Sequence, residues 1–324
     1  MVTSHIDSEF RVAVVGAGSI GSAFAFHLAR AGHDVTLVAR NPLRRSYVQQ
    51  HGLVARSRLG LWRRKSSIPV RVEGALSGQF DLVIVAVQRP QIESLIPVLA
   101  DNPSRQIMFM FNCASGADRW ADKIGPERQL WGFPAMLADM RGQVVEFAVV
   151  PSWMRFAQIT TIGRHDGAIT PEVQAIRQAF TDAGIPTVAS DKMDAWLKTH
   201  VAYMATLMAM GYSPRTSRIG PRFSPAQATF LAEAMQLSFA VVEANGVELT
   251  PANMRFLARL PRRVLAALLW VAFTLPMTKR SLASHSGAAP EEVATLLDEL
   301  TTLGQAAAMA TGPVAELAAG VPNE

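Results

Sequence analysis

VAVVGAGSIGSAFAFHLARAGHDVTLVARNP, residues 12–42, begins and nearly ends with an apolar run and has a glycine-rich turn after the first of them. Each apolar run predicts a buried strand, and residues 19–31 between them predict a helix that ends before Gly32. Two strands joined through one helix form a βαβ unit, in which the strands run parallel. The stretch therefore predicts a parallel sheet covered by helices.

Three glycines, Gly16, Gly18 and Gly21, have the spacing G-x-G-x-x-G between the first strand and the helix. In that context the spacing is typical of dinucleotide-binding proteins, because the turn presents backbone amides to a pyrophosphate at the positive end of a helix. The alternative is a plain glycine turn in an α/β protein that binds no ligand. The residues that we expect to bind the cofactor through this turn are Gly16, Ala17, Gly18, Ser19, Ile20 and Gly21.

Arg40 directly follows the second strand. An Asp or Glu at this position would accept hydrogen bonds from the 2′-hydroxyl of an adenosine ribose, whereas a guanidinium binds a 2′-phosphate. Arg40 therefore favours NADP(H) over NAD(H), and we expect Arg44 and Arg45 to add positive field nearby. The alternative for Arg40 is an ordinary exposed arginine at the end of a strand.

The first half of the chain alternates strand and helix patterns. Strands are expected at 11–16, 34–39, 80–87 and 106–112, with later strands at 143–150 and 157–163 that extend the sheet or form an antiparallel edge. Helices are expected at 19–31, 42–51, 90–100 and 171–184. This alternation predicts an α/β Rossmann-type fold.

From about residue 191 the strand patterns stop. Helices are expected at 193–210, 225–245, 262–275 and 290–310. We therefore expect an NADP-binding Rossmann-type domain over residues 1–190 and an all-α substrate and dimerisation domain over residues 191–324, with the ligand in the cleft between them. Several of these helices are apolar around most of their circumference, which predicts burial in a bundle or in a homodimer interface.

The composition excludes several classes of protein. Of the 324 residues 49% are hydrophobic and 18% charged, which argues against disorder. The formal net charge is +5, and its densest cluster, which we interpret as a solvated basic face, comprises Arg56, Arg58, Arg63, Arg64 and Lys65. No aromatic ladder or basic helix accompanies this cluster, so we expect no nucleic-acid partner.

Compartment and metal content also follow from residue patterns. Cys113 is the only cysteine, so no intrachain disulfide can form, which fits a reducing compartment. We expect no secretory signal in residues 1–10 and no membrane span, because the most apolar stretch, 264–277, is too short. We therefore expect a cytoplasmic protein. No grouping of His, Cys, Asp and Glu has metal-ligand spacing, so we also expect no metal.

With these residues placed, the chain resembles the ketopantoate reductase (2-dehydropantoate 2-reductase) family nearly from end to end. The segments that carry the resemblance are GAGSIGS, GHDVTLVAR, MFMFNCASG and DAWLKTHVAYMATLMA. The resemblance implies an NADPH-dependent reductase. It also implies that Lys198 is the catalytic lysine, Asn112 the asparagine beside the nicotinamide and Glu292 the glutamate that binds the substrate.

The departures from the family pattern lie mostly on the substrate side. Gln88 stands where the family often has a lysine, and Ala202 where it often has an asparagine. The segment KRSLASHSGAAPEEV, residues 279–293, replaces a Ser-Met-x-x-Asp segment, with Ser284 and His285 as further candidates to line the site. We therefore expect a small carbonyl substrate other than ketopantoate.

The candidate catalytic residues have both a chemical role and a plainer alternative. The ammonium of Lys198 is able to protonate a carbonyl oxygen that gains negative charge as hydride arrives, or it reaches the surface from an apolar helix. Asn112 and Gln88 follow strand ends, where open α/β sheets bind ligands, although an asparagine there also forms turns. Glu292 either accepts a substrate hydroxyl or complements the helix dipole.

Two functions are consistent with these residues. The first is reduction of a small 2-oxo acid or a related carbonyl compound by hydride from NADPH. The second is an NADPH-binding regulatory or sensor protein without turnover, which Ala202 and the missing serine segment favour. Lys198 opposes the sensor, because a sensor has no need of an ammonium beside its ligand.

Overall fold

The computed structural model describes residues 10–58, 65–149, 159–212, 223–274 and 290–322. The chain divides into two compact units. The first comprises Met1–Val87, Gln91–Phe111 and Trp120–Asp191. The second comprises Lys192–Glu324 together with two short segments from earlier in the chain, Gln88–Pro90 and Asn112–Arg119. Nothing in the sequence pattern indicated that these two segments belong with the helices.

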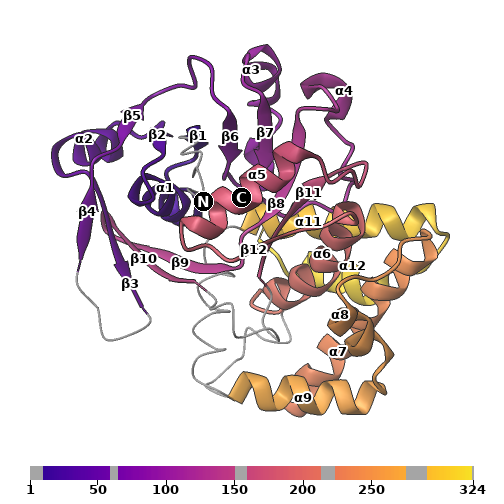
Figure 1. The fold of residues 1–324 in the computed structure, drawn as a ribbon. Helices are drawn as coiled ribbons and strands as arrows, with labels where there is room; N and C mark the ends of the chain where they lie inside the picture. The colour runs from indigo at the N-terminus through magenta and orange to yellow at the C-terminus, as the bar shows by residue number, and fades with distance from the viewer. Residues whose placement is uncertain (1–9, 59–64, 150–158, 213–222, 275–289, 323–324) are drawn as a thin grey trace, which may run out of the picture. The chain divides into compact units, whose positions relative to one another are not determined.

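An eight-stranded sheet forms the centre of the described part of the first unit, in the order β12-β11-β8-β7-β6-β1-β2-β5 (Figure 1). All neighbouring strands are parallel except β11 and β8, so the predicted parallel α/β sheet is confirmed. Its strands are β1 (Arg11–Val15), β2 (Asp34–Val38), β5 (Arg71–Glu73), β6 (Leu82–Val85), β7 (Gln106–Phe109), β8 (Gln129–Phe133), β11 (Thr160–Arg164) and β12 (Thr187–Ala189). Because β1, β6 and β7 are parallel, their carboxyl ends meet at one edge of the sheet.

A second, four-stranded sheet was not expected from the sequence. Its strands, in the order β4-β3-β10-β9, are β4 (Ser66–Ile68), β3 (Leu53–Ser57), β10 (Val144–Val149) and β9 (Met136–Arg141). The expected strand at 143–150 therefore belongs to this sheet and neither extends the main sheet nor edges it. The expected strand at 157–163 does form the antiparallel neighbour of β8, as β11.

Helix α1 (Ser19–Arg30) packs against strands of both sheets (Figure 1). Its side chains Phe24, Phe26 and Leu28 are at most 2% exposed. A helix buried on opposite faces needs apolar residues around its circumference, which explains why this one shows no narrow apolar stripe. The other helices of this unit are α2 (Pro42–His51), α3 (Ile96–Asp101), α4 (Ala121–Ile124) and α5 (Pro171–Asp182).

Asn41 caps α2, because its side chain accepts hydrogen bonds from the amides of Leu43 and Arg44. The helix expected at 90–100 is wrong in its bounds. A 3-10 turn (Arg89–Gln91) is followed by the short α3, in which Pro97 lies in the first turn. Proline lacks an amide hydrogen and disrupts a helix interior, so a helix from 90 must end before Pro97 and a new one begins there.

The basic cluster on β3 is not simply a solvated face. Arg56 and Arg58 both form ion pairs with Glu146 on β10, whose side chain is only 7% exposed. These pairs hold β3 and β10 together at the level of their side chains. Arg63 and Arg64 lie outside the described residues.

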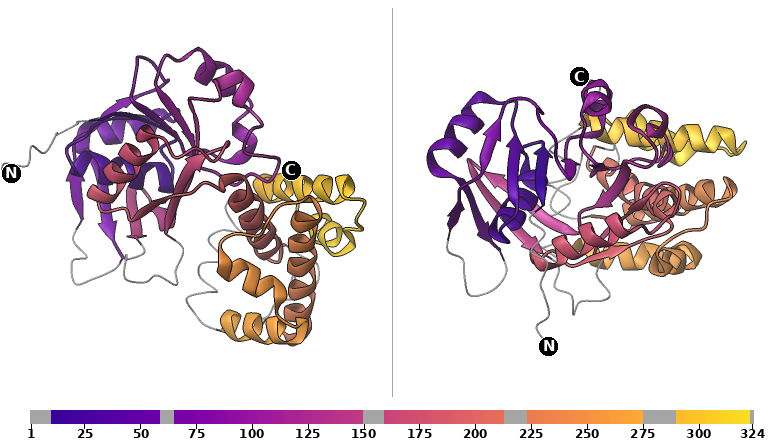
Figure 2. Two further views of the ribbon diagram at one scale, coloured as in Figure 1. Left: turned by 45° about the vertical axis from the view of Figure 1, so that its right-hand side comes forward. Right: turned by 45° about the horizontal axis from the view of Figure 1, so that its top comes forward.

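The second unit is built from helices, as expected, and its helices α7 to α12 are drawn orange to yellow in Figure 2. The bounds are α6 (Met193–Ala209), α7 (Pro225–Ala244), α8 (Ala252–Arg259), α9 (Arg262–Thr274), α11 (Pro290–Ala306) and α12 (Gly312–Ala319). The sequence pattern missed α8 and α12, which are only eight residues each. Helix α7 contacts α6, α9, α11 and α12, which explains its long apolar sequence.

Helix α9 is buried along one side only. Leu265, Leu269 and Phe273 are at most 8% exposed, whereas Leu268 and Val271 are more than half exposed. Burial within the bundle therefore accounts for one side of this helix only, and the alternative expectation of a homodimer interface on its outer side stays a prediction. No helix in the described ranges is both long and apolar enough to cross a membrane.

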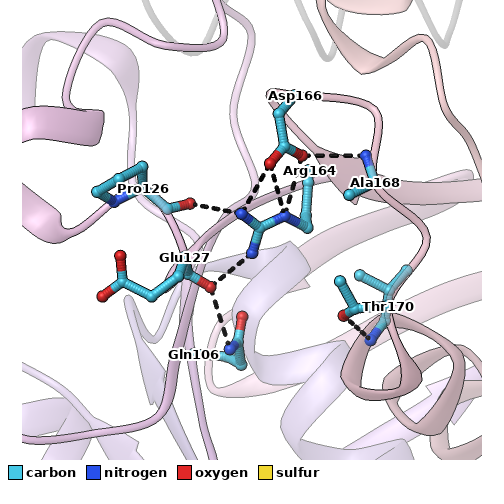
Figure 3. A network of polar contacts seen from close by, with 8 residues as sticks. Gln106, Pro126, Glu127, Arg164, Asp166, Ala168 and Thr170 are labelled. Atoms are coloured by element: carbon cyan, nitrogen blue, oxygen red, sulfur yellow. Dashed lines mark hydrogen bonds and ion pairs between the residues drawn. The ribbon is translucent and has the colours of Figure 1, made fainter.

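Arg164 joins the end of β11 to the segment before β8 (Figure 3). Its guanidinium donates three hydrogen bonds to the carboxylate of Asp166 and further ones to the carbonyl oxygens of Pro126 and Glu127. Asp166 also accepts the amide of Ala168 at 3.0 Å. The hydrogen bond from Arg164 lowers the pKa of the Asp166 carboxyl from 3.8 to about 2. This network holds the end of β11 against the segment that leads into its antiparallel neighbour, β8.

We expect the stability of the first unit to depend on the charge of Asp166. Since its pKa is lower in the folded chain, the carboxylate stabilises the fold above about pH 4, and this contribution is lost as the pH falls toward 2. The side chain is 41% exposed, so solvent screening reduces the contribution to about 1 kcal/mol. Urea unfolding of wild type and Asp166→Asn should show that difference at pH 6 and little difference at pH 2.

The matched control is Asp101→Asn, since Asp101 is also an exposed acid of the first unit. It should leave the free energy of unfolding unchanged at both pH values. A difference between wild type and Asp166→Asn that stays constant from pH 6 to pH 2 would contradict the role of the charge.

Candidate functional site

The glycine turn after β1 depends on close backbone approaches. Gly16 has φ +110°, and a Cβ there would lie 2.3 Å from the carbonyl oxygen of Ala86. A Cβ on Gly21 would lie 2.0 Å from the carbonyl oxygen of Gly16. Gly16 also donates its amide hydrogen to Val38 at 3.1 Å, which ties the turn to β2. These two glycines are therefore required by the fold itself.

Gly18 differs from the other two glycines. Its backbone is extended, with φ −73° and ψ −168°, and a Cβ there would meet no atom within 4 Å. The fold therefore does not require glycine at this position, and the open space lies at the N-cap of α1. Space for a close approach to the backbone at a helix N-terminus fits the pyrophosphate of a dinucleotide.

The N-terminus of α1 carries positive partial charge that its own side chains do not neutralise. In the described chain no side chain caps this helix, and its first turn contains no acidic residue. The amides of the first turn of any α-helix have no partner within the helix, because no helical carbonyl lies four residues before them. An anion is the natural partner for such a terminus, so the residues of the turn fit the phosphate groups of a dinucleotide.

Of the three arginines near the end of β2, Arg40 is the exposed one. Arg45 donates from Nη1 to the carbonyl oxygens of Ala39 and Arg40, at 2.8 and 2.7 Å, and so fixes the end of the strand. Arg44 is 6% exposed and donates to Ser22 Oγ at 3.2 Å and to a backbone carbonyl of the second sheet. Both side chains therefore hold the fold together, and the expectation that their charges add positive field near Arg40 stays a prediction.

Two segments that follow strands of the main sheet belong to the helical unit. Gln88 lies on the first of them and is exposed, and Asn112 lies on the second and is half-buried. The Nδ2 group of Asn112 donates to Oε1 of Glu292 at 3.3 Å. The structure therefore brings together Asn112 and Glu292, which are 180 residues apart.

Lys198 lies on α6 with a side chain that is 16% exposed. Its ammonium is 2.6 Å from Oδ2 of Asp194, one turn earlier on the helix. The other oxygen of Asp194 accepts the amide of Ala117 at 3.0 Å. Asp194 therefore links the lysine to the segment that carries Asn112. The sequence analysis missed Asp194, although its i, i+4 spacing from Lys198 is the spacing of an ion pair on a helix.

A second missed group is an ion pair between Arg89 and Glu299, with side chains 5% and 7% exposed. Arg89 directly follows Gln88, and Glu299 lies on α11. The second oxygen of Glu299 accepts the amide of Ala114 at 2.6 Å. No sequence signal identifies such a pair, because its partners are 210 residues apart.

Other residues of the helical unit lie away from these contacts or outside the described residues. His200 stacks on Trp196 with ring centroids 5.0 Å apart, which is consistent with a packed histidine. Ala202, which stands where the family often has an asparagine, is fully buried in the core of the helical unit. Ser284 and His285 lie outside the described residues. Within the described ranges no group of three or more His, Cys, Asp or Glu side chains is placed to hold a metal.

The chain is similar in sequence to known proteins. Residues 12–148 match the family model described as ketopantoate reductase PanE/ApbA. A 2-dehydropantoate 2-reductase of Aquifex aeolicus is 26% identical over 217 residues, which cover 61% of this chain and 61% of that protein. The matched region thus spans less than two thirds of this relative. The resemblance to the ketopantoate reductase family of oxidoreductases is confirmed.

Solved structures extend the likeness of fold over nearly the whole chain. The 2-dehydropantoate 2-reductase of Geobacter metallireducens GS-15 superposes with a TM-score of 0.71, at 17% identity, over 96% of this chain and 98% of that one. A D-mandelate dehydrogenase with NADH and anilino(oxo)acetate also has a TM-score of 0.71, at 15% identity and 96% coverage of both chains. The predicted fold class, a Rossmann-type part followed by helices, is therefore confirmed.

The glycine turn yields a paired prediction. Gly18→Ala should leave the thermal unfolding temperature unchanged, because its Cβ points into open space, but it should weaken dinucleotide binding at least tenfold. Gly16→Ala should instead destabilise the fold by several degrees, because its φ and the nearby carbonyl of Ala86 oppose a side chain. Thermal unfolding and calorimetric titration with NADPH measure the two effects.

The two variants control for each other. If Gly18→Ala bound the nucleotide as tightly as wild type, the turn would not be the pyrophosphate site. If it lost stability as Gly16→Ala does, the open space beside Gly18 would not exist in solution.

Proposed function

We propose that this chain is an NADPH-dependent reductase that transfers hydride to the carbonyl carbon of a small 2-oxo acid or a related carbonyl compound. The observation that carries the proposal is the largely buried ammonium of Lys198. Asp194 holds it and is bonded to the segment that bears Asn112. The Aquifex aeolicus relative is a 2-dehydropantoate 2-reductase, and one structural relative binds anilino(oxo)acetate, which supports a substrate of this class.

NADPH, when bound, supplies the hydride. The glycine turn and the N-terminus of α1 bind its phosphates, and Gln88 and Asn112 hydrogen-bond its nicotinamide half. The ammonium of Lys198 stabilises the negative charge that develops on the carbonyl oxygen and donates the proton that completes the alcohol. Asp194 orients this ammonium, and Glu292 accepts a hydrogen bond from the substrate. Each role is a proposal drawn from the chemistry of these side chains.

The proposed preference for NADPH over NADH rests on Arg40. The structural relatives do not supply it, because the D-mandelate dehydrogenase structure contains NADH. Arg40 is exposed at the end of β2, while Arg44 and Arg45 are bonded to the protein. Its guanidinium is therefore the one available to a 2′-phosphate.

We also propose a homodimer that forms through the helical unit, in the cytoplasm. Leu268 and Val271 on α9 are 52% and 53% exposed, and such side chains favour burial against another apolar surface. Cys113, the one cysteine, is a free thiol, which suits a reducing compartment.

NADPH should bind at least tenfold more tightly than NADH. A charge-assisted contact between Arg40 and the 2′-phosphate contributes about 1.5–3 kcal/mol, which corresponds to this difference or more. Arg40→Asp should abolish or reverse the preference, and calorimetric titration with both cofactors measures it. Arg30→Asp, at the opposite end of α1, is the control and should keep it. Equal affinities of the wild type for NADPH and NADH would refute this assignment.

Lys198→Ala should lower kcat by about 10²–10⁴-fold and leave the Kd of NADPH within twofold of wild type, because the lysine acts in the transition state. The assay follows NADPH oxidation with a panel of small 2-oxo acids that includes ketopantoate. Lys192→Ala removes an exposed lysine that pairs with Glu248, and this control should retain full activity.

The same assay separates the reductase from a sensor. NADPH binding without oxidation in the presence of any carbonyl compound of the panel would favour the sensor. Normal turnover by Lys198→Ala would remove the lysine from the chemistry.

A further inference from the structure

The ion pair of Arg89 and Glu299 is a buried charged group that the proposed chemistry does not use. Arg89 approaches Oε1 of Glu299 with Nε and Nη2, both at 2.9 Å. The amide of Ala114 donates to Oε2 at 2.6 Å. Burial of two charges is costly unless hydrogen bonds satisfy them, and here both carboxylate oxygens have donors. The cluster therefore has a fixed geometry that depends on one carboxylate.

This carboxylate connects the two segments that carry the proposed nicotinamide ligands. Arg89 directly follows Gln88, and Ala114 is two residues after Asn112. The strands before these segments, β6 and β7, are neighbours in the sheet, with Val85 opposite Phe109. The hydrogen bonds of the sheet end with β6 and β7. Beyond them, Glu299 fixes the distance between the segment that carries Gln88 and the segment that carries Asn112.

Helix α11 supplies a second contact to the same segment. Glu292 and Glu299 are seven residues apart, which is two turns, so both lie on one face of α11. Glu292 accepts from the side chain of Asn112, and Glu299 accepts from the backbone of Ala114. The helix therefore orients Asn112 in two ways: Glu292 accepts a hydrogen bond from its side chain, and Glu299 fixes the backbone at Ala114, two residues later.

We propose that Glu299, through Arg89 and Ala114, is a positioning residue that holds Gln88 and Asn112 in the arrangement that binds the nicotinamide half of the cofactor. It touches neither cofactor nor substrate. This proposal rests on the proposed function, since it assumes that Gln88 and Asn112 contact the nicotinamide half. The alternative is that Glu299 only stabilises the helical unit, in which case cofactor binding by the folded protein would not depend on it.

Glu299→Gln tests the role with almost no change of shape. Glutamine has one acceptor oxygen and one NH₂ donor, whereas Arg89 and Ala114 present donors to both oxygens of Glu299. A donor must then face a donor, so one of the two segments loses its contact. The probes are NADPH and adenosine 2′,5′-bisphosphate, which lacks the nicotinamide half.

Calorimetric titration should show that Glu299→Gln binds NADPH about tenfold or more weakly than wild type. The affinity for adenosine 2′,5′-bisphosphate should stay within twofold, because the glycine turn and Arg40 are unchanged. The ratio of the two affinities is the decisive readout, since a loss of stability alone lowers the folded fraction for both probes equally. Asp298→Asn, an exposed neighbour on α11, is the control and should keep both affinities.

Glu299→Gln removes the carboxylate that pairs with the buried Arg89, so circular dichroism first establishes that the variant folds. If it does not, the double variant Arg89→Met with Glu299→Gln is measured in its place. It removes both charges of the Arg89 and Glu299 pair, keeps an acceptor for Ala114 and frees only the Gln88 segment. The same selective loss is expected for it.

The outcomes separate the two proposals. Equal affinities of variant and wild type for NADPH, or equal losses for both probes, would overturn the positioning role. Failure of the wild-type protein to bind either probe would instead overturn the proposed function.

Discussion

The segment that follows β7 is held by carboxylates from the helical unit, and the candidate site depends on this arrangement. Within the described residues, Glu292, Glu299 and Asp194 each accept a hydrogen bond from a different point of this segment. A segment beyond the end of a strand has lost the hydrogen bonds of the sheet, so its conformation must be fixed by other acceptors. The same Asp194 carboxylate also holds Lys198. Lys198 and the segment that carries Asn112 are therefore held by the same small group of carboxylates.

The local part of the fold could be predicted because it is encoded in neighbouring residues. The strands β1 and β2, helix α1 between them and the Asn41 cap of α2 all follow from short patterns. The second sheet could not be predicted, because β3 pairs with β10 from about 90 residues further along the chain. The break in the helix expected at 90–100 could have been predicted from Pro97, because a proline fits the first turn of a helix and not its interior.

The site divides in the same way. Gly16, Gly18, Gly21 and Arg40 were identified from spacing, whereas Asn112, Lys198 and Glu292 were identified from the resemblance to a family. What neither source supplied were the residues that hold them, Asp194 and Glu299. A partner that is 210 residues away leaves no periodicity to detect, and an acid on a helix resembles any solvated acid until its burial is known. The burial of Ala202 in the core of the helical unit likewise has no signal in the sequence, because alanine occurs on buried and exposed helix faces alike.

The discontinuous helical unit also has a consequence for the order in which the chain can be completed during translation. Arg89 and Ala114 leave the ribosome long before Glu299, and at ordinary rates of synthesis the 210 residues between Arg89 and Glu299 take roughly 10–40 s. The parallel strands β1, β6 and β7 are complete by residue 109, so their sheet hydrogen bonds can form within this interval. During the same interval the segments Gln88–Pro90 and Asn112–Arg119 cannot form their contacts with Glu299, because Glu299 has not yet been synthesised. The proposed arrangement of Gln88 and Asn112 is therefore reached only after α11 has been synthesised.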